Sequence, residues 1–330
     1  MNLSSFSDQF KNEKDAGLFS AWQWNCIKNG KVSSGYSGTY DFKSGIEISD
    51  ETCFDLASLT KIVFTVPVIY ELIYKKTLNS DDKISSFFNN LNSDITIIEL
   101  LSHTSGLPAW LPIYEMVGQN LSLEERKKEV RKIISGSKTN DRSKCYSDLN
   151  YILLGFIIEK ITGSTLDTVF EKFKTDNNLI FNITFSPANQ TPLTAFSNLR
   201  NSYPTMTVED ENCWFLGGIC GHAGLFANSA SVVEYFHKLL NLDWFIKTAK
   251  LFDFAGFDRP EGNDSNYGKK ADLSFIGHLG FTGTAVLIDP KKKTVAALLT
   301  NCTHPNPEKP QRKERIKKCR QIFFDEVFKT

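Results

Sequence analysis

The stretch FDLASLTK, residues 54–61, with the apolar run IVFTVPVIY after it, residues 62–70, organises the rest of the sequence. Ser58 stands three residues before Lys61, so the two side chains fall on one face of a helix, where the hydroxyl and the amine can meet. Serine is a weak nucleophile that needs an adjacent base, and lysine can be that base if an apolar setting lowers its pKa. We expect the apolar run to supply that setting.

The same Ser-x-x-Lys spacing occurs twice more, at residues 80–83 and 135–138. Both copies lie among polar residues and are interpreted as solvated turns. An isolated Ser-x-x-Lys motif is a weak signal that depends on its structural context. The segments that surround Ser58 in the fold must therefore decide its role.

Composition excludes several classes of function. The chain has 330 residues, enough for a substantial core, and its 38 basic and 38 acidic residues balance, so no global field attracts nucleic acid. The longest apolar runs, near residues 62–70 and 151–158, are too short to span a bilayer. The N-terminal residues lack the pattern of a secretion signal, and seven cysteines without Cys-x-x-Cys spacing indicate neither a disulfide framework nor a zinc site. We expect a cytoplasmic protein.

The periodicity predicts a sheet built from both ends of the chain. Residues 17–27 and 31–40 alternate around Asn29-Gly30, a strong hairpin signal. Further strands are expected at residues 45–48, 273–276, 282–288 and 294–299, and helices at 2–16, 95–101, 122–134, 150–161, 164–173, 229–240 and 308–328. The sequence thus predicts one domain of class α/β (α+β), with a sheet region at residues 1–77 and 225–330 and a mainly helical region at 78–224.

Two polar segments need separate interpretation. Residues 182–212 contain prolines, lack a clear period and exceed an ordinary connector, so a substrate-side loop and a surface excursion both stay open. The basic cluster at residues 309–320 is interpreted as the wet face of a helix that buries Ile316, Phe323 and Val327.

Two further segments contain residues suited to catalysis. In CYSDLNYILLG, residues 145–155, Tyr146 stands at a helix start and could act as a base if Lys61 stabilised its phenolate. The alternative is a packing tyrosine with Asp148 as a helix cap. In GHLGFTGT, residues 277–284, glycines beside a pocket could leave amides free for an oxyanion, or could mark a bulged edge strand.

In this order, the three segments resemble those of the penicillin-recognising serine hydrolases, in the class C β-lactamase branch with its D-alanyl-D-alanine peptidases and esterases. The segment LLSHTSGLP, residues 100–108, and the segments 208–213 and 216–226 are also similar to that family, and the match covers roughly residues 15–328. The resemblance implies a β-lactamase/transpeptidase-like fold, in which helices flank an antiparallel sheet and a helical region is inserted.

The resemblance also assigns residues. It implies Ser58 as the nucleophile that forms an acyl-enzyme, with proton transfer shared by Lys61 and Tyr146. The amides of Ser58 and Phe281 would form the oxyanion hole, and the substrate would contact a set of four residues: Asp148, His278, Leu279 and Gly280. Neither a metal nor a cofactor is expected.

Two departures from the family pattern bear on specificity. Asp148 replaces the usual asparagine and can only accept hydrogen bonds; paired with Lys61, it would keep the lysine charged and favour a tyrosine phenolate as the base. Residues 278–280, His-Leu-Gly, stand where β-lactamases carry Lys-Thr-Gly. A histidine is mostly neutral at pH 7, so we expect weaker recognition of β-lactam carboxylates. Some peptidases of the family also carry His-Thr-Gly, and Leu279 removes their hydroxyl.

We therefore predict a metal-independent serine hydrolase for a small ester or amide. An esterase is favoured, because peptidoglycan crosslinks and β-lactams lie outside the expected compartment. The alternatives are a D,D-peptidase or weak class C-like β-lactamase, and a ligand-binding scaffold impaired by Asp148 and Leu279. The class A motif Ser-Asp-Asn and the Gly-x-Ser-x-Gly elbow do not occur. For His103 and His222 a structural hydrogen-bonding role is favoured, and neither the physiological substrate nor the oligomeric state is indicated.

Overall fold

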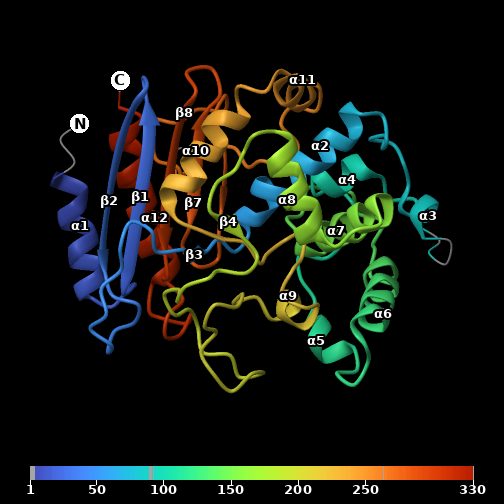
Figure 1. The fold of residues 1–330 in the computed structure, drawn as a ribbon, viewed down its shortest axis with the longest axis horizontal. Coiled ribbons are helices and arrows are strands. Elements are labelled where there is room, and N and C mark those ends of the chain that lie inside the picture. Colours follow the sequence, from blue (N-terminus) through green and yellow to red (C-terminus); the bar gives the residue numbers. More distant parts are fainter. Residues whose placement is uncertain (1–3, 89–90, 92, 263, 330) are drawn as a thin grey trace.

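The computed structural model describes residues 4–88, 91, 93–262 and 264–329. Its main sheet has five strands in the order β2-β1-β8-β7-β6, and every neighbouring pair is antiparallel. The strands are β1 (Ala21–Lys28), β2 (Lys31–Gly38), β6 (Ile276–Leu279), β7 (Ala285–Asp289) and β8 (Thr294–Thr300). The first two strands and the last three thus form one sheet, as predicted (Figure 1).

The β1–β2 hairpin confirms the prediction from Asn29-Gly30. Both turn residues have positive φ, 52° and 73°, as a turn that follows the strand twist requires. The prediction of a strand at residues 45–48 is wrong, because Glu47 forms only an isolated bridge with Thr39. This segment folds back on the end of β2 through a turn in which the Asp41 carboxylate accepts two backbone N–H groups.

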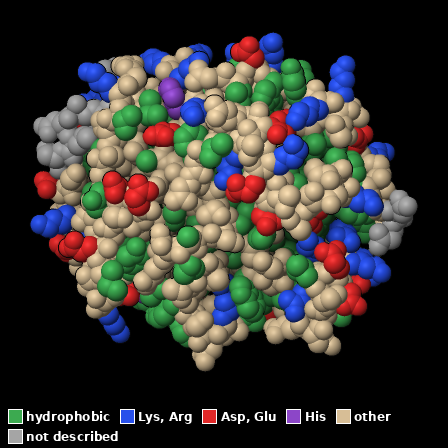
Figure 2. Space-filling model, viewed as in Figure 1, with side chains coloured by type: hydrophobic (Ala, Val, Ile, Leu, Met, Phe, Trp, Pro, Cys, Tyr) green, Lys and Arg blue, Asp and Glu red, His purple; other side chains and the backbone are tan. Residues whose placement is uncertain are grey.

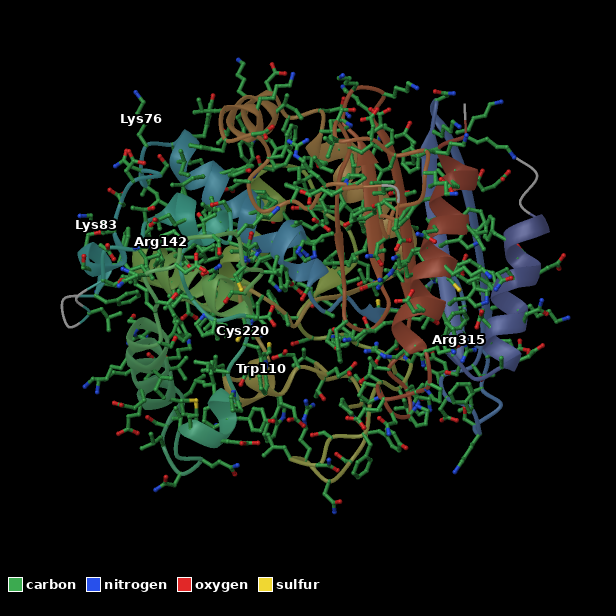
Figure 3. The ribbon with its side chains drawn as sticks, turned by 180° about the vertical axis from the view of Figure 1, so that it is seen from behind. Lys76, Lys83, Trp110, Arg142, Cys220 and Arg315 are labelled. Atoms are coloured by element: carbon green, nitrogen blue, oxygen red, sulfur yellow. The ribbon has the colours of Figure 1, made fainter. Side chains whose placement is uncertain are left out.

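Helices cover both faces of the sheet (Figure 1). Helices α1 (Ser4–Asp15) and α12 (Arg312–Val327) cover one face, and α10 (Ser229–Leu239) covers the other. On β1, Trp24 packs against Phe6 and Phe323, whereas Gln23 accepts a hydrogen bond from the α10 backbone, as the alternation of a strand requires. Figure 3 shows Arg315 between α12 and α1, where its Nε donates to Glu13.

The middle of the chain forms the helical region at the right of Figure 1. Its centre is α7 (Asp148–Thr162), in which every residue from 149 to 158 is buried. The other helical elements of this region and its edge are η1 (Lys61–Thr65, a π-helix), α2 (Val66–Tyr74), α3 (Ile84–Phe87), α4 (Ile97–Leu101), α5 (Ile113–Met116), α6 (Leu123–Gly136), α8 (Leu166–Asp176), α9 (Glu211–Phe215) and α11 (Asp243–Leu251). A small sheet of β3 (Phe54–Asp55), β5 (Phe226–Ala227) and β4 (Ile183–Thr184), in the order β3-β5-β4, lies beside it.

The predicted elements differ from the observed ones mainly at their ends. Strand β6 begins at Ile276 rather than at residue 273, because Asp272 accepts hydrogen bonds from Ser274 and Phe275 and holds these residues in a turn. The helix expected at residues 2–16 is α1; residues 2 and 3 lie outside the described residues. The predicted class, an antiparallel sheet flanked by helices with a helical region inserted, is confirmed.

Charges of both signs are interspersed over the face shown in Figure 2, in keeping with the balanced composition. Within the described residues, no helix combines the length and the apolar character needed to cross a bilayer.

Candidate active site

Ser58 stands in a tight turn between β3 and η1. The turn is closed by backbone hydrogen bonds from residue i+3 to residue i, including one of 3.1 Å from the Lys61 amide to the Ser58 carbonyl. Ala57 has φ of 46°, a conformation that costs energy for a residue with a side chain. The Asp55 carboxylate accepts the Ala57 N–H at 2.8 Å and holds this conformation. The expected meeting of Ser58 and Lys61 occurs, but in this turn rather than on an α-helical face.

Lys61 is fully buried and its ammonium has three acceptors. Nζ donates to Ser58 Oγ at 2.8 Å, to Asp148 Oδ1 at 2.7 Å and to the His222 carbonyl at 3.4 Å. Burial lowers the pKa of Lys61, but the charge of Asp148 and the nearby Tyr146 raise it by more, so the pKa lies above its ordinary value. The pairing with Asp148 therefore keeps this lysine protonated in the resting protein.

Tyr146 lies over the Lys61 ammonium, with 5.0 Å between Nζ and the ring centroid. Its side chain is 45% exposed, but its hydroxyl end faces Lys61 and Ser58. Burial of the phenol raises the pKa of Tyr146 and the charge of Lys61 lowers it by less, so the net shift is upward. The phenolate that the Asp148–Lys61 pair was expected to favour is therefore not the resting form.

Two neutral histidines flank Tyr146. His103 Nδ1 accepts from the Ser147 amide at 3.0 Å, and His278 Nδ1 lies 2.8 Å from the Leu279 carbonyl, to which it donates. Burial, reinforced by the charge of Lys61, lowers the pKa of each histidine to about 3. The bonds of His103 fit its expected structural role, and neither ring brings a positive charge to the site at pH 7.

The amides of Ser58 and Phe281 are free to point at a ligand. Within the described residues, neither amide N–H has a hydrogen-bond acceptor in the protein, and both residues line the same pocket. Thr282 and Thr284 donate to the backbone carbonyls of residues 55 and 56, which ties the segment after β6 to the Ser58 turn. A Cβ at Gly280 would lie 1.9 Å from Thr284 Oγ1, so only glycine fits between these segments.

Two buried arginines hold the loop that carries Phe281. Arg320 donates to the carbonyls of Gly280 at 3.1 Å and Gly283 at 3.2 Å, and Arg312 donates to the Phe281 carbonyl at 3.1 Å. The interpretation of residues 309–320 as a wet face is wrong for these two side chains, because loop carbonyls replace water as their partners. Their spacing of four residues on either side of buried Ile316 is the signal that could have revealed them.

The site lies in a cavity of about 900 Å³, within the range of small-molecule pockets. Lys61 lies beneath it, whereas the other predicted site residues line it: Ser58, Tyr146, Asp148, His278, Leu279, Gly280 and Phe281. Residues 195–197 and 209–212 also line the cavity. Part of the segment 182–212 thus lies at the cavity beside Ser58, as a substrate-side loop would, and its role toward a substrate stays a prediction.

The loop residues give one wall of the cavity an acidic character that sequence reasoning missed. Glu209, Asp210 and Glu211 all line the cavity. Burial raises the pKa of Glu209 to about 8, and its carboxylate accepts from Thr303 Oγ1 at 2.7 Å. Asp210 contacts His222 Nε2 at 3.0 Å. The consecutive acids in the sequence were a visible signal, but nothing placed them beside Ser58.

Comparison with known proteins places this fold and site in a family. The model of the family described as Beta-lactamase matches residues 23–319. The chain therefore belongs to the beta-lactamase family of serine hydrolases.

The similar proteins carry several names. The N-acetylmuramyl-L-alanine amidase of Bacillus subtilis (strain 168) is 29% identical, over 84% of this chain and 76% of its own length. A protein of Escherichia coli (strain K12) named "Putative D-alanyl-D-alanine carboxypeptidase" is 26% identical, over 84% of this chain and 75% of its own. A solved structure, "EstCE1, a hydrolase with promiscuous acyltransferase activity", superposes with a TM-score of 0.69 at 16% identity, covering 96% of this chain and 98% of its own.

Proposed function

We propose that this protein is a serine hydrolase that cleaves small esters or amides through an acyl-enzyme at Ser58. The observation that carries the proposal is the 2.8 Å contact between Lys61 Nζ and Ser58 Oγ at the base of a pocket with two free amides. A serine bonded to a base and facing preorganised donors is the arrangement that acyl transfer needs.

The proton moves through the groups that touch Ser58. In the reactive form, the Lys61 amine has lost a proton and takes the Ser58 proton as Oγ attacks the substrate carbonyl. The amides of Ser58 and Phe281 bind the resulting oxyanion, and Tyr146 passes a proton to the leaving group. Water then attacks the acyl-enzyme by the reverse transfers and frees Ser58. Because the pKa of Lys61 is raised and its neutral amine is the base, activity should increase as the pH rises above neutral, while the raised pKa of Tyr146 keeps its proton available for the leaving group.

The charges around Ser58 favour an uncharged acyl group. His278 is neutral where a β-lactamase carries lysine, and Lys61 is already paired with Asp148. The acidic wall supplies no free positive charge either, because Glu209 is mostly protonated at neutral pH and Asp210 is paired with His222. A short neutral ester is therefore the proposed substrate class, and the name of EstCE1 is in keeping with it.

A D,D-peptidase or weak β-lactamase is the second candidate, supported by the names of the curated relatives. A binding scaffold is the third, since Asp148 and Leu279 depart from the family pattern. Multiple turnover on any acyl substrate would eliminate the scaffold.

Labelling with a fluorophosphonate probe tests the proposal. We expect the intact mass of the wild type to increase by one probe adduct and that of Ser58→Ala to stay unchanged. The control is Ser80→Ala, because Ser80 has the same spacing to a lysine; this variant should be labelled as fully as the wild type. Competition with a short-chain ester and with penicillin then separates esterase from penicillin-binding chemistry. An unlabelled, folded wild type would contradict the activated nucleophile.

A further inference from the structure

Two buried thiols lie behind the acidic wall of the pocket. Cys213 belongs to α9 and Cys220 to the loop after it. Cys213 Sγ contacts the Ala223 carbonyl at 3.2 Å, and Cys220 Sγ lies 4.0 Å from the Cys213 carbonyl. The two thiols also interact with each other, and both are free thiols in the structure. Figure 3 shows Cys220 in the interior, in contrast to Lys76 and Lys83 at the periphery.

The backbone between these cysteines is shaped to bring them together. Gly217 and Gly218 have φ of 94° and 83°, a conformation that residues with side chains rarely adopt. The Gly218 amide donates to the Cys213 carbonyl at 2.8 Å, which turns the chain back toward α9. The two cysteines thus stand seven positions apart in the sequence, while their side chains lie in one cluster.

His222 supplies a charge to this cluster. Its ring is 1% exposed, and its Nε2 lies 3.0 Å from Asp210 Oδ1. Among the described residues its Nδ1 has no hydrogen-bond partner of ordinary geometry, and the His222 side chain interacts with the Cys220 thiol as well as with Asp210. Burial lowers the pKa of His222, but Asp210 raises it by more, to about 10, so the ring is an imidazolium at neutral pH.

This imidazolium distinguishes Cys220 from the other buried thiols. Burial raises the pKa of Cys220, but the Cys213 thiol and His222 lower it by more, to about 7. Burial raises the pKa of Cys26 to about 11 and that of Cys319 to about 12. A thiolate is the reactive form of cysteine, so Cys220 is the reactive member of the buried set.

Other functions of this cluster are disfavoured. In the part of the chain that the structure describes, no group of three or more His, Cys, Asp and Glu side chains is arranged to hold a metal ion. Cys220 does not line the cavity around Ser58, so it is not placed to attack a substrate there. Its exposure of 4% admits a small oxidant in preference to a bulky disulfide such as glutathione disulfide.

We propose that Cys213 and Cys220 form an oxidisable dithiol that reacts with hydrogen peroxide. The Cys220 thiolate attacks one peroxide oxygen, which gives a Cys220 sulfenic acid and releases hydroxide. The sulfur of Cys213 then attacks the sulfenic acid sulfur, forms the disulfide and displaces hydroxide. The Cys213 proton converts this hydroxide to water, and the proton that Cys220 lost on ionisation converts the first hydroxide to water. Overall, two thiols and one hydrogen peroxide give one disulfide and two waters.

Peptide mapping of the wild type tests this directly. The native protein is exposed to stepwise hydrogen peroxide, blocked with N-ethylmaleimide, digested and analysed by mass spectrometry. We expect a peptide pair joined through Cys213 and Cys220 that separates on reduction with dithiothreitol. If both residues remain maleimide-labelled after denaturation of treated protein, while exposed Cys145 is oxidised, the proposal is wrong.

Variants assign the two roles. Cys213→Ala should leave a Cys220 sulfenic acid that dimedone traps, and Cys220→Ala should leave Cys213 reduced. Cys302→Ala, at another buried thiol, is the matched control and should form the joined peptide at the wild-type rate. His222→Gln should slow the reaction at pH 7 about tenfold or more, because the thiolate fraction falls. Trapping of dimedone at Cys213 in place of Cys220 would overturn the assignment, and the wild-type map stands even if a variant misfolds.

Discussion

Asp148 Oδ1 lies 2.7 Å from Lys61 Nζ, and Ser58 Oγ lies 2.8 Å from the same nitrogen. A carboxylate and the proposed nucleophile thus share one buried ammonium. The Asp148 carboxylate fixes the position of Lys61, but it also keeps the Lys61 amine protonated. At neutral pH, few molecules therefore carry the neutral amine that must accept the Ser58 proton.

Replacement of Asp148 by asparagine should shift the pH dependence of the reaction. The negative charge of Asp148 raises the pKa of Lys61, and the reaction needs the neutral amine of Lys61. Asp148→Asn removes this charge, so the ascending limb of kcat/KM against pH should move to lower pH. Asp176→Asn, which breaks an exposed ion pair on α8, should leave the limb unchanged. An unmoved limb in Asp148→Asn would show that the carboxylate does not control the base.

Replacement of Arg320 by lysine should lower kcat more than it changes KM. Lysine keeps the charge but loses the planar set of donors that binds the carbonyls of Gly280 and Gly283. Misplacement of the Phe281 amide should then cost about 10-fold to 100-fold in kcat. Arg315→Lys, at the Glu13 pair outside the site, is the control. Equal kcat values in the two variants would mean that Arg320 does not position this loop.

The carboxyl group of Glu209 should make stability depend on pH. Its folded pKa of about 8 exceeds the ordinary value of 4.5, so its contribution to stability is complete below pH 4.5 and is lost as the pH rises through about 8. Glu209→Gln mimics the protonated form at every pH. Its Tm should therefore match the wild type near pH 4.5 and exceed it by a few degrees at pH 9. Glu129→Gln, in an exposed pair, should show no such divergence, and parallel wild-type and Glu209→Gln curves would refute the assignment.

A methyl group at Gly221 should destabilise the fold. A Cβ there would lie 2.2 Å from the Tyr151 carbonyl and 3.1 Å from the Gly155 amide, where the loop before β5 packs on α7. Gly221→Ala should lower the free energy of unfolding by about 1–3 kcal/mol. Gly136→Ala, at the end of α6 with open space around it, should be at least as stable as the wild type. Urea denaturation of both variants provides the comparison.

The parts of the fold that could be predicted have strong local signals. Asn29-Gly30 indicated the hairpin, and Gly163 marked the end of α7, where it adopts φ of 66°. Strands β3, β4 and β5 have two residues each, too few for any period, and they are held by pairing across the chain. Helix α11 has Leu242 before it and no side-chain cap, so it lacked a start signal.

The part of the candidate site that lies on the three segments 54–61, 145–155 and 277–284 was predicted from the sequence. These segments brought Ser58, Lys61 and Tyr146 together with Phe281, but their catalytic roles stay predictions, as do the domain boundaries and the cytoplasmic location. The buried arginines and the acidic wall were missed because their partners are backbone carbonyls and loop residues far away in the sequence. Periodicity reports which face a residue occupies, and it does not report what packs on that face.

The pairing of β1 with β8 has a consequence for how the protein is made. Trp22 lies opposite Thr300, and Ile27 opposite Val295, so the centre of the sheet joins segments from both ends of the chain. During synthesis from the N-terminus, the hairpin emerges with one edge unpaired and with Trp24 lacking Phe323. Such surfaces invite aggregation, which makes the nascent chain a natural client for chaperones. The sheet closes only after the ribosome has added residue 300, so this edge of β1 stays unpaired while the whole helical region is being made.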